Sequence, residues 1–160
     1  VSASFIPFSV TLKIRAKKGA FTPYAGFGPT FVFGAKTIST EREEDRVAGI
    51  IEKTEEETTY NMGIGLHGVV GTDYNVSDSF VIFGQIRADQ LSLTPDKGKV
   101  TKYTVNGVNQ LSTLTVSDRE TTYKDDAGGA SGAANVPSVE RAIPIAASSV
   151  AINFGIAYKF

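Results

Sequence analysis

The sequence has no cysteine, a single histidine and no continuous apolar run of 18 residues. Without cysteine the chain forms no disulfide and offers no thiolate for catalysis or for zinc. Without a long apolar run it contains no candidate for a membrane-spanning helix. Its net charge of -1 gives no excess of positive charge to hold a phosphate backbone, so we expect no nucleic acid partner. Val1 leads directly into apolar sequence, so we expect any export signal to have been removed already.

Alternation of large apolar residues with small or polar residues is the strongest pattern present, and it is clearest over 147–160. Ile152, Phe154 and Ile156 fall on one face of that segment, and Asn153 falls on the other. A period of two residues predicts a β-strand. The same pattern predicts further strands at about 4–16, 21–36, 59–75 and 79–93. The sequence therefore predicts an all-β antiparallel fold.

The connections between these strands are of two lengths. Two are tight turns, whereas the polar stretches 37–58 and 94–146 are long. This asymmetry is typical of a membrane barrel that has tight turns at its periplasmic end and long loops outside. Within the second stretch, Asn106-Gly107 predicts a turn, and we expect its hairpin to stand in the outer loop. The prediction is one β-barrel domain over 1–160 with long polar extracellular loops.

The face opposite the large apolar residues distinguishes a soluble barrel from a membrane barrel. In a soluble barrel the outer face carries charged and polar residues, but here the second face is mostly glycine, alanine, serine and threonine. Small residues suit the inside of a narrow barrel, and the large apolar residues would then face lipid. Aromatic residues gather at one level of that face as a membrane girdle: Phe21, Tyr74, Phe80, Tyr158 and Phe160. A soluble antiparallel sandwich or barrel with an aromatic core is the alternative interpretation.

Four segments carry a resemblance to a known family: FIPFSVTLKI, TPYAGFG, GIGLHGVVGTDY and FGIAYKF, at 5–14, 22–28, 63–74 and 154–160. They resemble the outer-membrane protein β-barrel family of small, eight-stranded, OmpA-like transmembrane barrels, and they cover roughly half of the chain. The resemblance implies an antiparallel barrel in the bacterial outer membrane. It also implies that the terminal Phe160 belongs to the signal that the barrel-assembly machinery reads during insertion.

The five predicted strands are too few for a barrel of this family. They look like its last five strands, so we expect either N-terminal strands upstream of Val1 or another chain to complete the wall. Strand directions lead to the same expectation. With Phe160 in the periplasm, the first predicted strand would start at the outer surface, where a mature terminus is not expected. A membrane hairpin around Asn106-Gly107 would add two strands and leave the count odd.

Charged and polar residues on the inner face are expected to form a network that fills the lumen: Lys13, Arg15, His67, Gln85, Arg87 and Asp89. Unpaired charge would be costly there, and eight strands leave just enough room for side chains, so we expect a plugged interior. A lone histidine is a poor metal site, and no opposed pair of carboxylates stands out. We therefore expect no catalytic residue, no metal and no cofactor. The acidic segment 37–58 is expected to be a solvated surface loop, with cation or partner binding as the alternative.

These features predict a non-enzymatic outer-membrane β-barrel with a side-chain-filled lumen, which acts as a structural or surface-interaction protein through its extracellular loops. The expected partners are outer-membrane lipids and lipopolysaccharide, the barrel-assembly machinery, and a partner protein that completes or flanks the barrel. Three alternatives stay open. They are a narrow porin-like channel for ions or small solutes, a subunit of a larger outer-membrane assembly, and a surface enzyme acting on lipid or peptide.

Overall fold

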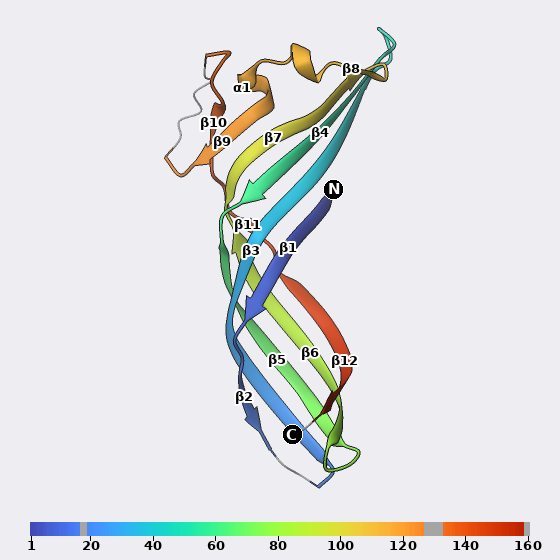
Figure 1. The fold of residues 1–160 in the computed structure, drawn as a ribbon, viewed down its shortest axis with the longest axis vertical. Helices are drawn as coiled ribbons and strands as arrows, with labels where there is room; N and C mark the ends of the chain where they lie inside the picture. The colour runs from blue at the N-terminus through green and yellow to red at the C-terminus, as the bar shows by residue number, and fades with distance from the viewer. Residues whose placement is uncertain (17–18, 127–132, 159–160) are drawn as a thin grey trace. The chain divides into compact units, whose positions relative to one another are not determined.

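The computed structural model describes residues 1–16, 19–126 and 133–158, and it is mostly β. Its strands form one large, mixed and largely antiparallel sheet (Figure 1). Across the described residues, hydrogen bonds do not close this sheet into a barrel. No helix in the same residues is long and apolar enough to cross a membrane. The predicted β fold is confirmed in its mostly β, largely antiparallel character, whereas the sheet is mixed and barrel closure is not observed in this part of the chain.

The chain divides into two compact units. The first unit comprises Val1–Ile6, Phe33–Gly63 and Leu93–Ile145. The second unit comprises Pro7–Val32, Ile64–Ser92 and Ala146–Phe160. The long strand β3 (Phe21–Asp45) contributes residues to both.

Five strands of the second unit lie side by side in the order β2-β3-β5-β6-β12 (Figure 1). In addition to β3, these strands are β2 (Leu12–Arg15), β5 (Gly63–Asn75), β6 (Phe80–Leu93) and β12 (Ser149–Tyr158). Strand β1 (Ser2–Ser9) also pairs with β3. The pairs β2–β3, β5–β6 and β6–β12 are antiparallel. Phe21 contacts Tyr74 and Tyr24 lies against Gly71, so one residue number rises as the other falls. Strands β3 and β5 are therefore antiparallel as well.

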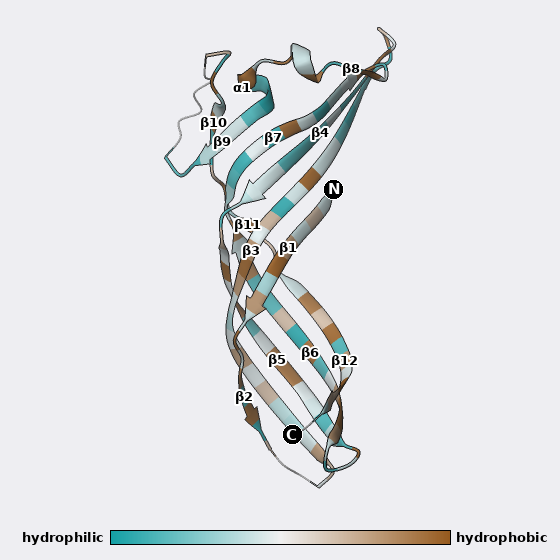
Figure 2. Cartoon of the chain, viewed as in Figure 1, coloured by the Kyte–Doolittle hydropathy of each residue, from teal (hydrophilic) through white to brown (hydrophobic). Residues whose placement is uncertain are grey.

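Alternate side chains on these strands point to opposite faces, and the two faces differ in kind. The inner face carries buried residues, including Val32 at 1% exposure and His67 at 3%. The outer face carries large apolar residues that are exposed, including Leu66 at 67% and Phe154 at 80%. Figure 2 shows the resulting alternation of hydrophobic and hydrophilic bands along β5, β6 and β12. The core of the second unit lies on the inner face and contains these residues: Tyr24, Val32, Val69, Val81 and Leu91.

The first unit is built on antiparallel pairing of β3 with β4 (Ile50–Tyr60) and of β4 with β7 (Pro95–Val105). Strand β7 also pairs with β9 (Glu120–Lys124), and β9 pairs in parallel with β10 (Ser138–Arg141). The short elements are β8 (Val108–Asn109), the 3₁₀ helix η1 (Leu111–Thr113), α1 (Val116–Arg119) and β11 (Ile145–Ala146), which pairs with β6.

The polar stretches 37–58 and 94–146 differ from the predicted loops. Strands β3 and β4 extend through most of the first stretch as an antiparallel hairpin, and β7 to β11 lie in the second. β-branched threonine and isoleucine recur along β3 and β4, which favours an extended backbone. Charges across the strands add support, since Lys36 Nζ donates to Glu57 Oε2 at 3.1 Å. The first stretch, interpreted from its polar composition as a solvated loop, is therefore mostly strand, and the second contains further strands besides the expected hairpin.

The turn predicted at Asn106-Gly107 is confirmed. Both residues have positive φ angles, 49° and 81°, as a two-residue hairpin turn between twisted strands requires. Val105 and Val108 are register partners on either side of it. The Asn106 side chain also accepts a hydrogen bond from the backbone N–H of Ile51 at 2.9 Å, which ties the turn to β4.

Two other predicted strands are interrupted. The segment 4–16 forms β1 and β2, which are separated by Val10 and Thr11. The segment 59–75 contains the end of β4 and, after a two-residue break, all of β5. The strands predicted at 79–93 and 147–160 lie close to β6 and β12 over the residues described.

Glu56 on β4 should make the first unit less stable as pH rises. Burial, together with the nearby carboxylates of Glu140 and Glu41, raises the pKa of Glu56 above its ordinary value. A carboxyl group with a raised folded-state pKa stabilises the protein below its ordinary pKa, and that stabilisation is lost as pH rises through the folded-state value. Glu56→Gln should therefore increase the stability of β4 at neutral pH and should reduce its pH dependence.

Native-state hydrogen exchange of β4 amides, corrected for intrinsic rates and compared at acidic and neutral pH, measures this effect. Glu55→Gln is the matched control, because the register partner of Glu55 on β7 is Lys102, whereas that of Glu56 is the uncharged Val100. Greater protection at neutral pH in the Glu55 variant than in the Glu56 variant would contradict the prediction.

Candidate functional site

A buried polar network lies on the inner face of the second unit. It joins side chains from β1, β3, β5 and β6 and from the β1–β2 connection: Ser9, Thr11, Thr30, His67, Arg87 and Asp89. Their positions follow from alternation and register, because His67 and Asp89 are direct cross-strand partners and Arg87 lies two residues from Asp89. This set of six residues is the polar network.

Arg87 and Asp89 form the charged centre of the polar network. Arg87 Nε donates to Asp89 Oδ2 at 2.8 Å, and Arg87 Nη2 donates to Asp89 Oδ1 at 2.7 Å. The same Nη2 atom donates to Ser9 Oγ at 2.7 Å, and Thr30 donates to Asp89 Oδ1 at 3.4 Å. The guanidinium is thus paired with a carboxylate and bound by hydroxyl groups, as a charge on a largely buried face requires.

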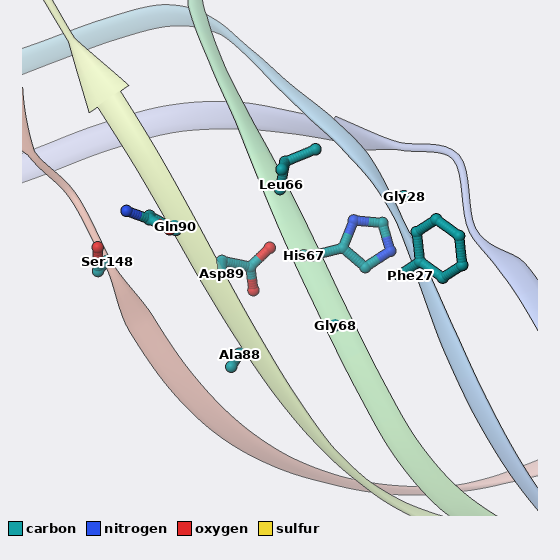
Figure 3. A pocket seen from close by; sticks show the side chains of 9 residues that line it. All are labelled: Phe27, Gly28, Leu66, His67, Gly68, Ala88, Asp89, Gln90 and Ser148. Atoms are coloured by element: carbon teal, nitrogen blue, oxygen red, sulfur yellow. The ribbon is translucent and has the colours of Figure 1, made fainter.

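His67 is held by threonine hydroxyls on both sides of its ring. Thr11 Oγ1 lies 2.8 Å from Nε2, and Thr30 Oγ1 lies 3.0 Å from Nδ1. Figure 3 shows His67 and Asp89 on the neighbouring strands β5 and β6. The hydrogen bonds of the Asp89 carboxylate come from Arg87 and Thr30 rather than from the imidazole. These side chains therefore do not align a nucleophile, a histidine and an orienting carboxylate in series.

Tyr24 organises a second group of inner-face residues. Its hydroxyl donates to Gln85 Oε1 at 2.9 Å, and Lys13 Nζ lies 4.5 Å from the centroid of its ring. Farther along the strands, Arg15 forms an ion pair with Asp73 at 3.7 Å. Side-chain exposure in this pair is 54% for Arg15 and 14% for Asp73, so the arginine is much more open to its surroundings than Arg87.

The predicted lumen residues all lie on the inner face, but they form three groups. His67, Arg87 and Asp89 belong to the polar network, Lys13 and Gln85 meet at Tyr24, and Arg15 pairs with Asp73. The sequence prediction omitted several of their partners: Ser9, Thr11, Tyr24, Thr30 and Asp73. The same alternation that places Lys13 and His67 on the inner face also places these residues there, so the signal was present.

A glycine on β5 makes room for the Tyr24 ring. A Cβ atom at Gly71 would lie 2.7 Å from Tyr24 Cζ and 2.6 Å from the carbonyl oxygen of Gly84. Gly71→Ala should therefore destabilise the protein by about 1–3 kcal/mol, because neither the ring nor the backbone has room to move away. Urea titration of the folded protein measures the loss.

Gly68 on the same strand supplies the control. A Cβ atom there meets nothing within 4 Å, so Gly68→Ala should leave stability within about 0.5 kcal/mol of the original. Equal losses at the two positions would mean that strand flexibility, rather than the space beside Tyr24, sets the requirement for glycine.

The outer face carries the aromatic residues predicted to form a girdle. The rings of Phe21 and Tyr74 are 4.9 Å apart, and those of Phe80 and Tyr158 are 5.2 Å apart. All four lie at the end of the second unit that holds the turn between β5 and β6. The fifth predicted member, Phe160, lies outside the described residues.

A hollow of about 500 Å³ adjoins the polar network (Figure 3). Its lining includes Phe27, Leu66 and Ala88 as well as His67 and Asp89. Within the described ranges, no group of three or more histidine, cysteine, aspartate or glutamate residues is placed to hold a metal ion. The exposed side chains of Phe27 and Leu66 place the hollow against the outer face, so it offers mainly apolar surface. The side chains of His67 and Asp89 are hydrogen-bonded within the polar network.

Comparison of the chain with protein-family models, with curated proteins and with solved structures gave no match. The features that indicate a function are therefore the two faces of the second unit and the contacts of its inner face.

Proposed function

We propose that the chain forms part of the wall of a bacterial outer-membrane β-barrel whose interior is filled by side chains. One observation carries the proposal: the second unit has the reverse of a water-soluble arrangement, with charged residues buried on one face and large apolar residues exposed on the other. An exposed apolar surface of this extent marks contact with another apolar medium or partner. The hydrocarbon layer of a membrane would cover the exposed apolar residues of all five strands at the same time.

The distribution of exposed apolar residues supports a lipid-facing surface. They occur on all five strands of the second unit and include these residues: Leu12, Ile14, Phe27, Ile64, Leu66, Val70, Ile82, Ile86, Val150, Ile152 and Ile156. The two aromatic pairs at the turn end fit the girdle that borders the apolar band of a membrane barrel. Lipopolysaccharide and outer-membrane phospholipid are accordingly the proposed surroundings.

The polar network supports a filled interior over an open channel. Arg87 donates directly to Asp89, and His67 is hydrogen-bonded to Thr30. The Tyr24 ring fills the space beside Gly71. A small barrel lined in this way has little room for a continuous water path. The proposed role is therefore structural or surface interaction, and the hairpin of β3 with β4 is the polar surface proposed for interaction outside the membrane. A narrow channel for ions or small solutes is the competing proposal, and steady openings in planar bilayers would favour it.

A second candidate function is membership of a larger outer-membrane assembly. The observation that favours it is the open sheet: within the described residues, β12 pairs with β6 and β2 pairs with β3, and each is an edge strand. Membrane barrels have no open edges in hydrocarbon, so additional strands must complete the wall.

Fractionation and gel migration test the membrane proposal. The protein should remain in outer-membrane pellets after carbonate washing, and unboiled samples should migrate faster than boiled samples, because a membrane barrel stays folded in detergent until it is heated. Recovery in the soluble fraction with no change of migration on heating would overturn the proposal.

A further inference from the structure

The two edge strands of the second unit run in the same direction. Each of the pairs β2–β3, β3–β5, β5–β6 and β6–β12 reverses the chain, and four reversals restore the original direction. A strand that pairs antiparallel with β12 therefore runs opposite to β2 as well. Any wall that joins these edges through antiparallel pairing alone must contain an odd number of additional strands.

The β12 edge lacks the features that usually prevent strand addition. Its ten residues contain no proline and no charge, and its register with β6 is unbroken from Ser149 to Tyr158. Half of the backbone N–H and C=O groups of an antiparallel strand point to each side, so those of Ser149–Ala157 that are turned away from β6 need another partner. In hydrocarbon no water can supply it.

We propose that β12 is a strand-addition site for a polypeptide segment that differs from this chain, runs antiparallel to β12, and contributes an odd number of strands ending beside β2. The inference deepens the proposed membrane function and rests on it. The faces of β12 define the partner's chemistry. Opposite Ile152 and Phe154 the added strand should carry apolar residues, and opposite Asn153 it should carry small or polar residues.

Strand direction argues against a second copy of this chain as the partner. Two copies with the same orientation in the membrane could join β12 of one to β2 of the other only as parallel neighbours. Antiparallel pairing of two copies of β12 would require one copy to be inverted across the membrane. The asymmetry of short turns at one end and the polar first unit elsewhere in the chain opposes that inversion.

Photo-crosslinking in the native membrane tests the proposal. Ile152 and Val70 both pair with Ile86 in register, so they lie at one level of the outer face, one on the edge strand and one on a central strand. Ile152→p-benzoylphenylalanine is the probe, Val150→p-benzoylphenylalanine is a second probe on the same strand, and Val70→p-benzoylphenylalanine is the control. The cells co-express an affinity-tagged and an untagged copy of the chain, and mass spectrometry identifies the linked peptides.

The expected result is that the two β12 probes link to a peptide of a different polypeptide, whereas the Val70 probe gives lipid adducts and no such peptide. Links that join a tagged copy to an untagged copy would show a second copy at the edge and would overturn the inference, as would links to another segment of the same polypeptide. Lipid adducts alone at both β12 positions would also overturn it. Failure of the membrane proposal itself gives a different result, namely no lipid adduct at Val70 and recovery of the protein in the soluble fraction.

Discussion

Asp89→Ala should destabilise the folded protein by about 3 kcal/mol, because Arg87 would lose its carboxylate partner on a buried face. The Asp89 carboxylate accepts three hydrogen bonds from Arg87, at 3.1, 2.8 and 2.7 Å, and another from Thr30. The side chains of Arg87 and Asp89 retain 25% and 12% exposure, which favours the lower end of the range for buried pairs. Urea titration in detergent micelles, followed by the fraction that migrates as folded protein, measures the change.

Two comparisons separate this effect from a general loss of charge. Asp73→Ala breaks the more exposed pair with Arg15 and should cost at most about 1 kcal/mol. The double variant Arg87→Met with Asp89→Leu removes both charges and should recover much of the stability that Asp89→Ala loses. Losses of similar size in the Asp73 and Asp89 variants would contradict the central position assigned to the polar network.

Ile86→Arg should destabilise the membrane-inserted protein by about 2–4 kcal/mol, the cost of placing arginine near the middle of the hydrocarbon layer. Ile86 is 50% exposed and has Val70 and Ile152 as its register partners on either side, so it lies well inside an apolar row. On a water-soluble protein the same change at an exposed position would alter stability by no more than about 0.5 kcal/mol. Urea titration of the protein in lipid bilayers measures the difference.

Phe80→Arg is the matched control, because Phe80 lies on the same face of β6 but at the turn end of the strand. Near the membrane surface the cost of arginine falls to about 0–1 kcal/mol. A dependence on position, with a large loss at Ile86 and a small loss at Phe80, is the signature of a lipid layer. Equal and small losses would be incompatible with a lipid-facing sheet.

Alternation is sufficient to predict the strands and the faces of the second unit. Side chains repeat every two residues in a strand, so the sequence alone assigns Lys13, His67 and Arg87 to one face. The turn at Asn106-Gly107 is equally accessible from sequence, because few residue pairs adopt positive φ angles without strain.

Pairing between strands could not be predicted in the same way. The contact of Thr30 with both His67 and Asp89 depends on the register of β3 against β5, which depends on the packing of whole strands. The extension of β3 and β4 through 37–58 was missed because polar composition was interpreted as loop, although β-branched residues and the Lys36–Glu57 contact stabilise extended chain in water. Closure of the sheet depends on which strands meet at its edges, and alternation within a strand carries no information about that choice.

The registers of β5 with β6 and of β6 with β12 are unbroken, so insertions or deletions within these strands keep each side chain on its face only when they change the length by an even number of residues. One residue inserted in the middle of β6 would exchange the faces of all residues beyond it, and would turn Arg87 outward and Ile86 inward. Two inserted residues would restore each side chain to its own face. Length variation within these strands during evolution should therefore occur in steps of two, whereas the turn at 76–79 is free to change by single residues.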